Sequence, residues 1–174
     1  TKAPPVTLPI YAASIPVFTQ MLGGLQTVLR KAEAHATDKK IDPNALLQAR
    51  LFPDMFPLLR QVQVACDFAK SVSARLAGVE VPKMEDTEQT FADLQARIAA
   101  VLAFLGSLDA EQFAEAAQRE IVTQAGTPKE KRFTGQSYLF NYGLPHFFFH
   151  TTTAYAILRH SGVEVGKKDY IGTY

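Results

Sequence analysis

Two histidines, His146 and His150, are the residues of this 174-residue chain whose types and spacing most directly suggest chemistry. They lie four positions apart in the string Leu-Pro-His-Phe-Phe-Phe-His-Thr-Thr-Thr-Ala-Tyr. Because an α-helix turns once every 3.6 residues, both imidazoles leave one helix face a turn apart, where they could bind a single divalent metal ion. Alternatively, both are core histidines whose ring N–H groups meet carbonyls or tyrosine hydroxyls. The spacing alone leaves both interpretations open.

A third metal ligand would have to come from another helix that faces the same space. The second long predicted helix offers four polar candidates: Gln61, Gln63, Cys66 and Asp67. Of these, Gln61 lies beside the apolar stripe of its helix and is the candidate that we carry forward. Three other side chains are expected to line the same space: Asp54, Tyr142 and Tyr155. The glutamate of an H-E-x-x-H zinc protease is missing because Phe147 follows His146, so that class is excluded.

Four segments with a helical repeat of apolar residues must position these side chains. Three of them predict helices over residues 10–37, 55–77 and 135–160. The other helix, third in order, is predicted to start after Asp86, which forms a capping box with Gln89, and to end at Leu105. The last helix is expected to be kinked near Gly143-Leu-Pro145. The stripe of this helix that is expected to face the bundle interior consists of Leu139, Tyr142, His146, Phe149, His150, Thr153 and Ile157. In the helix predicted over residues 10–37, Gly23-Gly24 indicates a close approach of another helix.

Shorter elements are predicted between the long helices. A proline at the first helical position starts a short helix over residues 43–49, and residues 109–113 form one helical turn. Alternating residues at 120–123 and 131–133, on either side of Gly126-Thr-Pro128, predict a small β-hairpin before the last helix. The fold class is therefore all-α, a four-helix bundle with a hairpin excursion, in one domain spanning residues 1–174.

Composition excludes several function classes. With 18 Lys and Arg against 17 Asp and Glu, the net charge of +1 offers no electrostatic footprint for nucleic acid. Residues 133–158 carry no charged side chain, but their His, Thr, Asn, Gly and Pro content favours a central bundle helix over a membrane span. The single cysteine, Cys66, cannot form an internal disulfide and reads as a small buried apolar residue. We expect a cytoplasmic protein.

Three stretches resemble a known family: Ile-Tyr-Ala-Ala-Ser-Ile-Pro-Val-Phe near the start, Leu-Phe-Pro-Asp-Met-Phe-Pro-Leu-Leu-Arg-Gln-Val-Gln in the middle, and His-Phe-Phe-Phe-His-Thr-Thr-Thr-Ala-Tyr near the end. Over residues 10–172 the chain is similar to an uncharacterised domain-of-unknown-function family within the DinB/YfiT-like superfamily. That resemblance implies up-down-down-up helices, often a dimer, and a divalent metal held by three histidines. His146 and His150 match two of them, Arg159 matches a common arginine, and Gln61 stands where the third histidine would be.

Two functions follow from these observations. The first is a divalent-metal-dependent enzyme of hydrolase or thiol-transferase type, with zinc or nickel at a degenerate site formed by His146, His150 and, as a weak third ligand, Gln61. The second is a metal-free bundle that binds a small ligand or a second copy of itself. A homodimer is expected in either case, because the consecutive rings at 147–149 cannot all enter one core.

Overall fold

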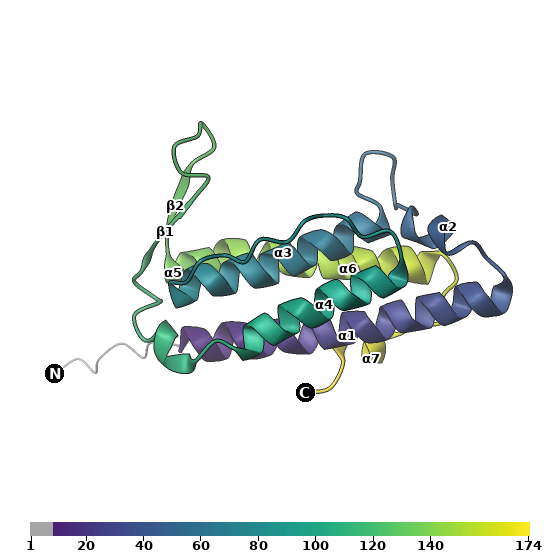
Figure 1. Ribbon diagram of the computed structural model, residues 1–174, viewed down its shortest axis with the longest axis horizontal. Helices are drawn as coiled ribbons and strands as arrows, with labels where there is room; N and C mark the ends of the chain where they lie inside the picture. Colours follow the sequence, from purple (N-terminus) through teal and green to yellow (C-terminus); the bar gives the residue numbers. More distant parts are fainter. Residues whose placement is uncertain (1–8) are drawn as a thin grey trace.

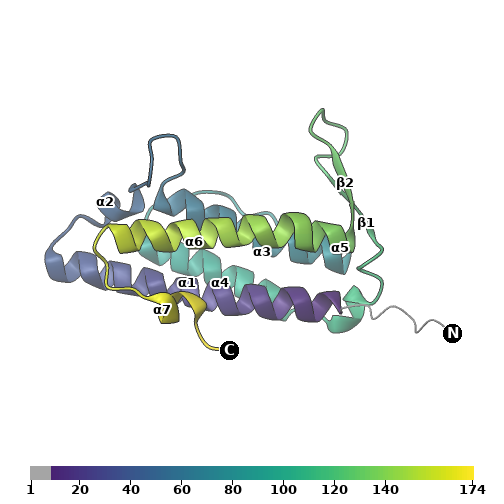
Figure 2. The ribbon, with the colours of Figure 1, turned by 180° about the vertical axis from the view of Figure 1, so that it is seen from behind.

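The computed structural model describes residues 9–174, and its core is formed by four long helices. These are α1 (Ile10–Lys39), α3 (Leu58–Ala77), α4 (Phe91–Gly106) and α6 (Leu144–His160). Helices α1 and α6 run in one direction and α3 and α4 in the other (Figure 1, and from behind in Figure 2). The predicted up-down-down-up bundle is confirmed.

Apolar stripes fill the interior of the bundle. In α1 the buried positions follow the helical repeat from Ile10 through Phe18 and Leu25 to Ala32. The ring of Phe18 meets the ring of Phe147 of α6 edge to face, with centroids 4.8 Å apart. A short helix, α2 (Pro43–Leu47), follows α1 as expected, capped by the side chain of Asp42.

Residues 78–90 form a long crossover that returns along the bundle, which is why α3 and α4 are parallel (Figure 1). The guanidinium of Arg97, buried in α4, fixes this segment. It lies 2.7 Å from a carboxylate oxygen of Asp67 on α3, and 3.0 Å from carboxylate oxygens of Asp86 and Glu88 on the crossover. One buried cation therefore ties together three parts of the chain.

Two projections rise from the same side of the bundle, near opposite ends (Figure 1). One is the loop between α2 and α3, over residues 48–57. The other is the predicted hairpin, in which β1 (Glu120–Thr123) pairs antiparallel with β2 (Lys131–Thr134), Ile121 opposite Phe133. The short helix η1 (Ala110–Phe113) precedes the hairpin, where one helical turn was expected.

Two predicted helix starts are wrong. The second long helix begins at Leu58 instead of residue 55, because Pro57 is its extended N-terminal neighbour and not part of its first turn. The third begins at Phe91, where Thr90 and Asp93 form the capping box that was assigned to residues 86 and 89. Asp86 instead pairs with Arg97, as described above.

The last predicted helix is divided into three parts. Helix α5 (Gly135–Ser137) leads into a π-helical segment, η2 (Tyr138–Gly143), and α6 follows. The wider π turn replaces the expected kink near Gly143-Leu-Pro145. At Gly143 a Cβ would lie 2.9 Å from a methyl carbon of Val72, so the absence of a side chain allows η2 to pack closely on α3.

A further helix, α7 (Lys167–Ile171), was not predicted and packs across α1. The Lys31 ammonium lies 2.8 Å from the Asp169 carboxylate, and the Gln20 side-chain amide donates to the carbonyl of Ile171 at 3.1 Å. A Cβ on Gly24 would collide with the Tyr170 carbonyl oxygen, whereas Gly23 has open space around it. The close approach predicted at the paired glycines is thus made by Gly24 to α7.

None of the helices in the described residues is long and apolar enough to cross a membrane. The uncharged stretch of residues 133–158 begins at the end of β2 and continues through α5, η2 and α6, which lie along the bundle (Figure 2). Its lack of charge reflects contact with several neighbouring elements.

The two glycines provide a matched test of the α1–α7 contact. Gly23→Ala should raise the free energy of unfolding by about 1 kcal/mol, because alanine is the better helix former and its methyl meets nothing. Gly24→Ala should be less stable than Gly23→Ala by about 1–3 kcal/mol, because its methyl must displace α7. Urea unfolding measures both; equal stabilities would contradict the contact.

Candidate functional site

The candidate site lies where α3 and α6 pack antiparallel, the most extensive helix contact of the described chain. Gln61 of α3 meets His150 of α6. Seven residues further along α3, Phe68 meets His146. The π-segment η2 adds Tyr142, whose ring contacts both Phe68 and His146. Three elements therefore bring the two histidines against one amide and two aromatic rings.

A chain of hydrogen bonds fixes the chemical state of His150. The Gln61 Nε2 amide donates to the carbonyl oxygen of Phe56 at 3.2 Å, so Gln61 Oε1 faces His150 Nδ1, 2.7 Å away. Because an amide oxygen only accepts, Nδ1 carries the proton. In the neutral ring Nε2 then keeps its lone pair, and among residues 9–174 it has no hydrogen-bond partner and is not one of the buried unpartnered atoms, so it is open to solvent.

His146 has a different environment. Its ring stacks on Phe68 with centroids 4.6 Å apart and planes 14° apart, and Tyr142 lies tilted at the same centroid distance. It is exposed, as is Phe149, whereas the neighbouring Phe147 is fully buried. The expectation that His146 and Phe149 face the bundle interior is therefore wrong, and His150, only 8% exposed, is the histidine that enters it.

Both imidazoles are held neutral near pH 7. Burial lowers the pKa of His150 from its ordinary 6.5 to about 4, and the positive charges of a protonated His146 and of Arg60 lower it further. Burial, followed by the charge of Lys131, also lowers the pKa of His146. All the charges that act on the two rings are positive.

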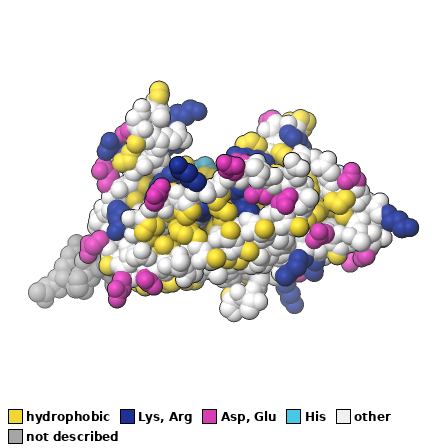
Figure 3. All heavy atoms as spheres, in the orientation of Figure 1, with side chains coloured by type: hydrophobic (Ala, Val, Ile, Leu, Met, Phe, Trp, Pro, Cys, Tyr) yellow, Lys and Arg dark blue, Asp and Glu magenta, His cyan; other side chains and the backbone are white. Residues whose placement is uncertain are grey.

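The histidines border an open hollow of about 440 Å³ lined by Pro145, His146, Phe149 and His150. This volume falls in the range typical of small-molecule sites. Figure 3 shows histidine atoms at the surface in the depression between the two projections, with basic, acidic and apolar side chains around them. The hollow therefore combines apolar surface with two neutral nitrogen-containing rings.

Other predicted site residues are placed as follows. Tyr142 lies at the histidines, as expected. Asp54 is exposed on the loop before α3. Tyr155 packs on Tyr170, and its hydroxyl faces the carbonyl of Val165 at 3.5 Å, so it belongs to the α7 side of the bundle. Neither Asp54 nor Tyr155 is brought to the histidines.

Two further contributors were not identified from the sequence. Phe68 follows Gln61 by seven residues, a spacing that places both on one helix face and could have revealed it. Lys131 comes from the hairpin, with its ammonium 5.7 Å from the centre of the Tyr142 ring, and no sequence spacing predicts that contact.

The remaining residues of the resemblance lie elsewhere. Arg159 is exposed, and its guanidinium donates to the carbonyl of Val165 at 3.2 Å. Cys66 is fully buried, as expected, and burial raises the pKa of its thiol to about 12. A thiol in that state is neither a nucleophile nor a metal ligand at neutral pH.

The donor set does not fit a three-ligand metal centre. Among residues 9–174 there is no group of three His, Cys, Asp or Glu side chains placed to hold a metal ion. The oxygen of Gln61, the third candidate, already accepts the proton of His150 Nδ1. Catalytic zinc sites usually have three protein ligands, and only His146 and His150 are available here.

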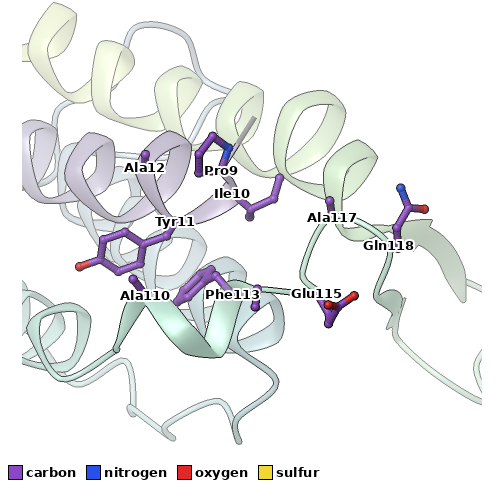
Figure 4. A pocket seen from close by; sticks show the side chains of 10 residues that line it. Pro9, Ile10, Tyr11, Ala12, Ala110, Phe113, Glu115, Ala117 and Gln118 are labelled. Carbon is purple, nitrogen blue, oxygen red and sulfur yellow. The ribbon is translucent and has the colours of Figure 1, made fainter. Parts of the chain in front are cut away.

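A second hollow, of about 470 Å³, lies between the start of α1 and η1 (Figure 4). Tyr11 and Phe113 meet edge to face at its side, with centroids 5.3 Å apart. Its lining contains neither histidine nor cysteine, and Glu115 is its only acidic group among the described residues. It offers no set of reactive groups comparable to the α3–α6 site.

The bundle order and the paired histidines on its last long helix define the class, a DinB-like helical bundle. Residues 10–171 match the family described as domain of unknown function DUF1993, and the chain belongs to that family. A crystal structure of a protein described as a DinB family member from Shewanella denitrificans is 46% identical, with 95% of this chain and 93% of that chain covered and a TM-score of 0.89. The search of curated proteins found no match to the chain.

The low pKa of His150 predicts a pH dependence of stability. An unfolded histidine binds a proton near pH 6.5, whereas His150 in the folded protein does so only near pH 4. The contribution of neutral His150 is therefore complete above pH 6.5 and is lost as the pH falls toward 4. Between pH 7 and pH 4.5 we expect a loss on the order of 2 kcal/mol, measured by urea unfolding.

Two matched variants test whether His150 causes that loss of stability. His150→Asn should flatten the pH profile, whereas His146→Asn, which leaves His150 in place, should retain most of it. A profile of His150→Asn as steep as that of the unsubstituted protein would contradict the assignment.

Proposed function

We propose that this chain is a metal-free bundle that binds a small organic ligand in the hollow beside His146 and His150. One observation carries the proposal: Gln61 Oε1 and His150 Nδ1 lie 2.7 Å apart, a hydrogen-bond distance. This contact engages the oxygen that would be the third metal ligand, and it sets the tautomer of a buried imidazole at the edge of the hollow. A cytoplasmic location is part of the proposal, supported by a single, buried thiol.

The chemistry of the lining supports an organic ligand. Phe149 is 55% exposed and Pro145 is also exposed, so the hollow presents apolar surface to solvent. Binding sites of this size commonly combine such surface with a few polar atoms that orient the ligand. Here His146 and the outward nitrogen of His150 are those polar groups.

The second candidate function is a metal-dependent hydrolase or thiol transferase, and one observation favours it. A metal-binding histidine usually donates its second ring N–H to a fixed acceptor, as His150 does to Gln61, and keeps the other nitrogen for the metal. His150 Nε2 and His146 would be the protein ligands of zinc or nickel in that case. Two imidazoles alone form a weak site, which is why we rank this candidate second.

Metal content separates the two candidates. Protein purified without an affinity tag or chelator, incubated with zinc and then desalted, should retain well below one equivalent per chain. Gln61→His supplies a third imidazole on α3 and should raise the retained zinc toward one equivalent, because three protein ligands are then present. Elemental analysis measures both proteins.

The control is His146→Ala/His150→Ala in the Gln61→His background, which should lose the gained zinc. Near one equivalent in the unsubstituted protein, lost in His146→Ala/His150→Ala, would overturn the metal-free proposal and establish the second candidate.

A homodimer is also part of the proposal, and exposed apolar rings support it. Phe147 is buried and Phe148 is partly buried, so only Phe149 of that run is left outside. Phe56, on the other side of the Gln61–His150 pair, is 49% exposed, and Phe52 of the same loop is 63% exposed. A second copy packing over the loop before α3 would remove the rings of Phe52 and Phe56 from water and would leave the ring of Phe149 to the ligand.

Light scattering tests the dimer. The unsubstituted protein should show a mass near twice 19.2 kDa, and Phe52→Ser should shift it toward the mass of one chain. Phe140→Ser is the matched control, because Phe140 is also exposed but lies on η2, among residues that line a different hollow. A monomer of 19.2 kDa before any substitution would remove the dimer from the proposal.

A further inference from the structure

The hydrogen-bond chain that ends at His150 also specifies what the ligand must offer. The carbonyl of Phe56 can only accept, so it orients the Gln61 amide, and the amide oxygen in turn orients the proton of His150 onto Nδ1. The remaining nitrogen, Nε2, is therefore an acceptor. No described residue donates to Nε2, and it is not one of the buried atoms that lack a partner, so it is open to solvent and a ligand in the hollow can donate to it in place of water.

The charges around the hollow restrict the ligand further. Lys131 acts on His146, and Arg60 acts on His150; no carboxylate is among the charges that act on either ring. The carboxylate next to Arg60 is that of Asp86, which lies 2.5 Å from the Arg60 guanidinium and is paired there. A cationic ligand would be repelled by the Lys131 ammonium and would find no carboxylate among the charges that act on the two rings, so the donor that reaches Nε2 belongs to an uncharged group.

The surface beside Nε2 is suited to a flat apolar body. The ring of Phe149 stands at 90° to the ring of His150 with centroids 5.1 Å apart, and it is more than half exposed. Pro145 and the exposed imidazole of His146 complete the lining. Aromatic rings pack on such surfaces by stacking and edge-to-face contacts.

We propose that the hollow binds a neutral phenol, with its ring against Phe149 and its hydroxyl donating a hydrogen bond to His150 Nε2. This inference rests on the proposed metal-free ligand site and names its ligand class. The proton stays on the phenol oxygen, because the buried, Gln61-paired imidazole accepts a hydrogen bond and not a charge. Gln61 acts as a positioning residue that keeps Nε2 unprotonated.

The test compares two compounds, one with the hydroxyl donor and one in which a methyl group blocks it. The probes are 4-methylphenol, which remains un-ionised at pH 7 since phenols of this kind have a pKa of about 10, and 4-methylanisole, in which a methyl group replaces the hydroxyl proton. Calorimetric titration of the metal-free protein should show 4-methylphenol binding about tenfold more tightly, because only its O–H pairs with the buried acceptor.

Variants of Gln61 test the tautomer of His150 without removing the buried histidine, and the measured quantity is again the ratio of the affinities for the two compounds. Gln61→Met deletes the oxygen that selects the tautomer and should reduce the preference for the phenol to about threefold or less. Gln61→Glu places a carboxylate opposite Nδ1, which raises the pKa of His150 and favours a proton on Nε2, so it should also reduce the preference. Thermal unfolding of each variant, compared with the unsubstituted protein, verifies that the bundle is folded.

The outcomes separate this inference from the proposed function. Equal affinity for both compounds would overturn the phenol assignment while supporting a ligand site for flat apolar compounds. Binding of neither compound would overturn the phenol assignment and count against the hollow as an organic-ligand site. Preference for the phenol that is unchanged in Gln61→Met would overturn the role of the amide.

Discussion

The arrangement of this bundle depends on one buried charge. Two parallel neighbours, α3 and α4, require a connection that returns along the whole length of the bundle, and residues 78–90 make it without regular secondary structure. Arg97 holds that connection through Asp86 and Glu88 while binding Asp67 on α3. A buried guanidinium is costly to desolvate, and it is tolerated here because three carboxylates surround it. The arginine therefore specifies the chain path more than it adds stability.

The network and the candidate site occupy different faces of α3. Gln63 and Asp67 face the crossover and α4, where the Gln63 amide donates to Glu88 at 2.7 Å. Gln61 and Phe68 face α6 and its histidines. Both glutamines are buried although they lie two positions apart, because each face has its own packing partner. The helix that anchors the crossover is thus the one that positions the site.

The sequence predicts the bundle well because its helical repeats are long and its turns carry recognisable residues. It predicts the site less well, and the π-segment is the reason. A stripe drawn with a repeat of 3.6 from Leu139 to Ile157 assigns His146 and His150 to one buried face. The wider turn of η2 shifts the side chains before α6 around the helix axis, so a single 3.6-residue repeat does not extend from η2 into α6. In α6 itself, Phe147 takes the interior position while His146 stays exposed. Spacing gives relative positions on a helix but not the rotation of that helix toward its neighbours. The contacts of Lys131 and of the Phe56 carbonyl involve segments far from α6 in sequence, so no local pattern contains them.

The crossover and the site meet at Arg60, which is adjacent to Gln61 in the sequence. Its guanidinium pairs with Asp86 on the crossover, packs on the ring of Phe56 at 5.8 Å, and lowers the pKa of His150. Phe56 in turn supplies the carbonyl that orients the Gln61 amide. The same residues that secure the chain path therefore maintain the neutral, outward-accepting state of His150. Glutamine suits this position because it carries no charge at any pH and uses one end of its amide on the backbone and the other on the imidazole. The site is thus organised to keep a proton in a fixed place, which is a requirement for recognising a hydrogen-bond donor and does not depend on a metal ion.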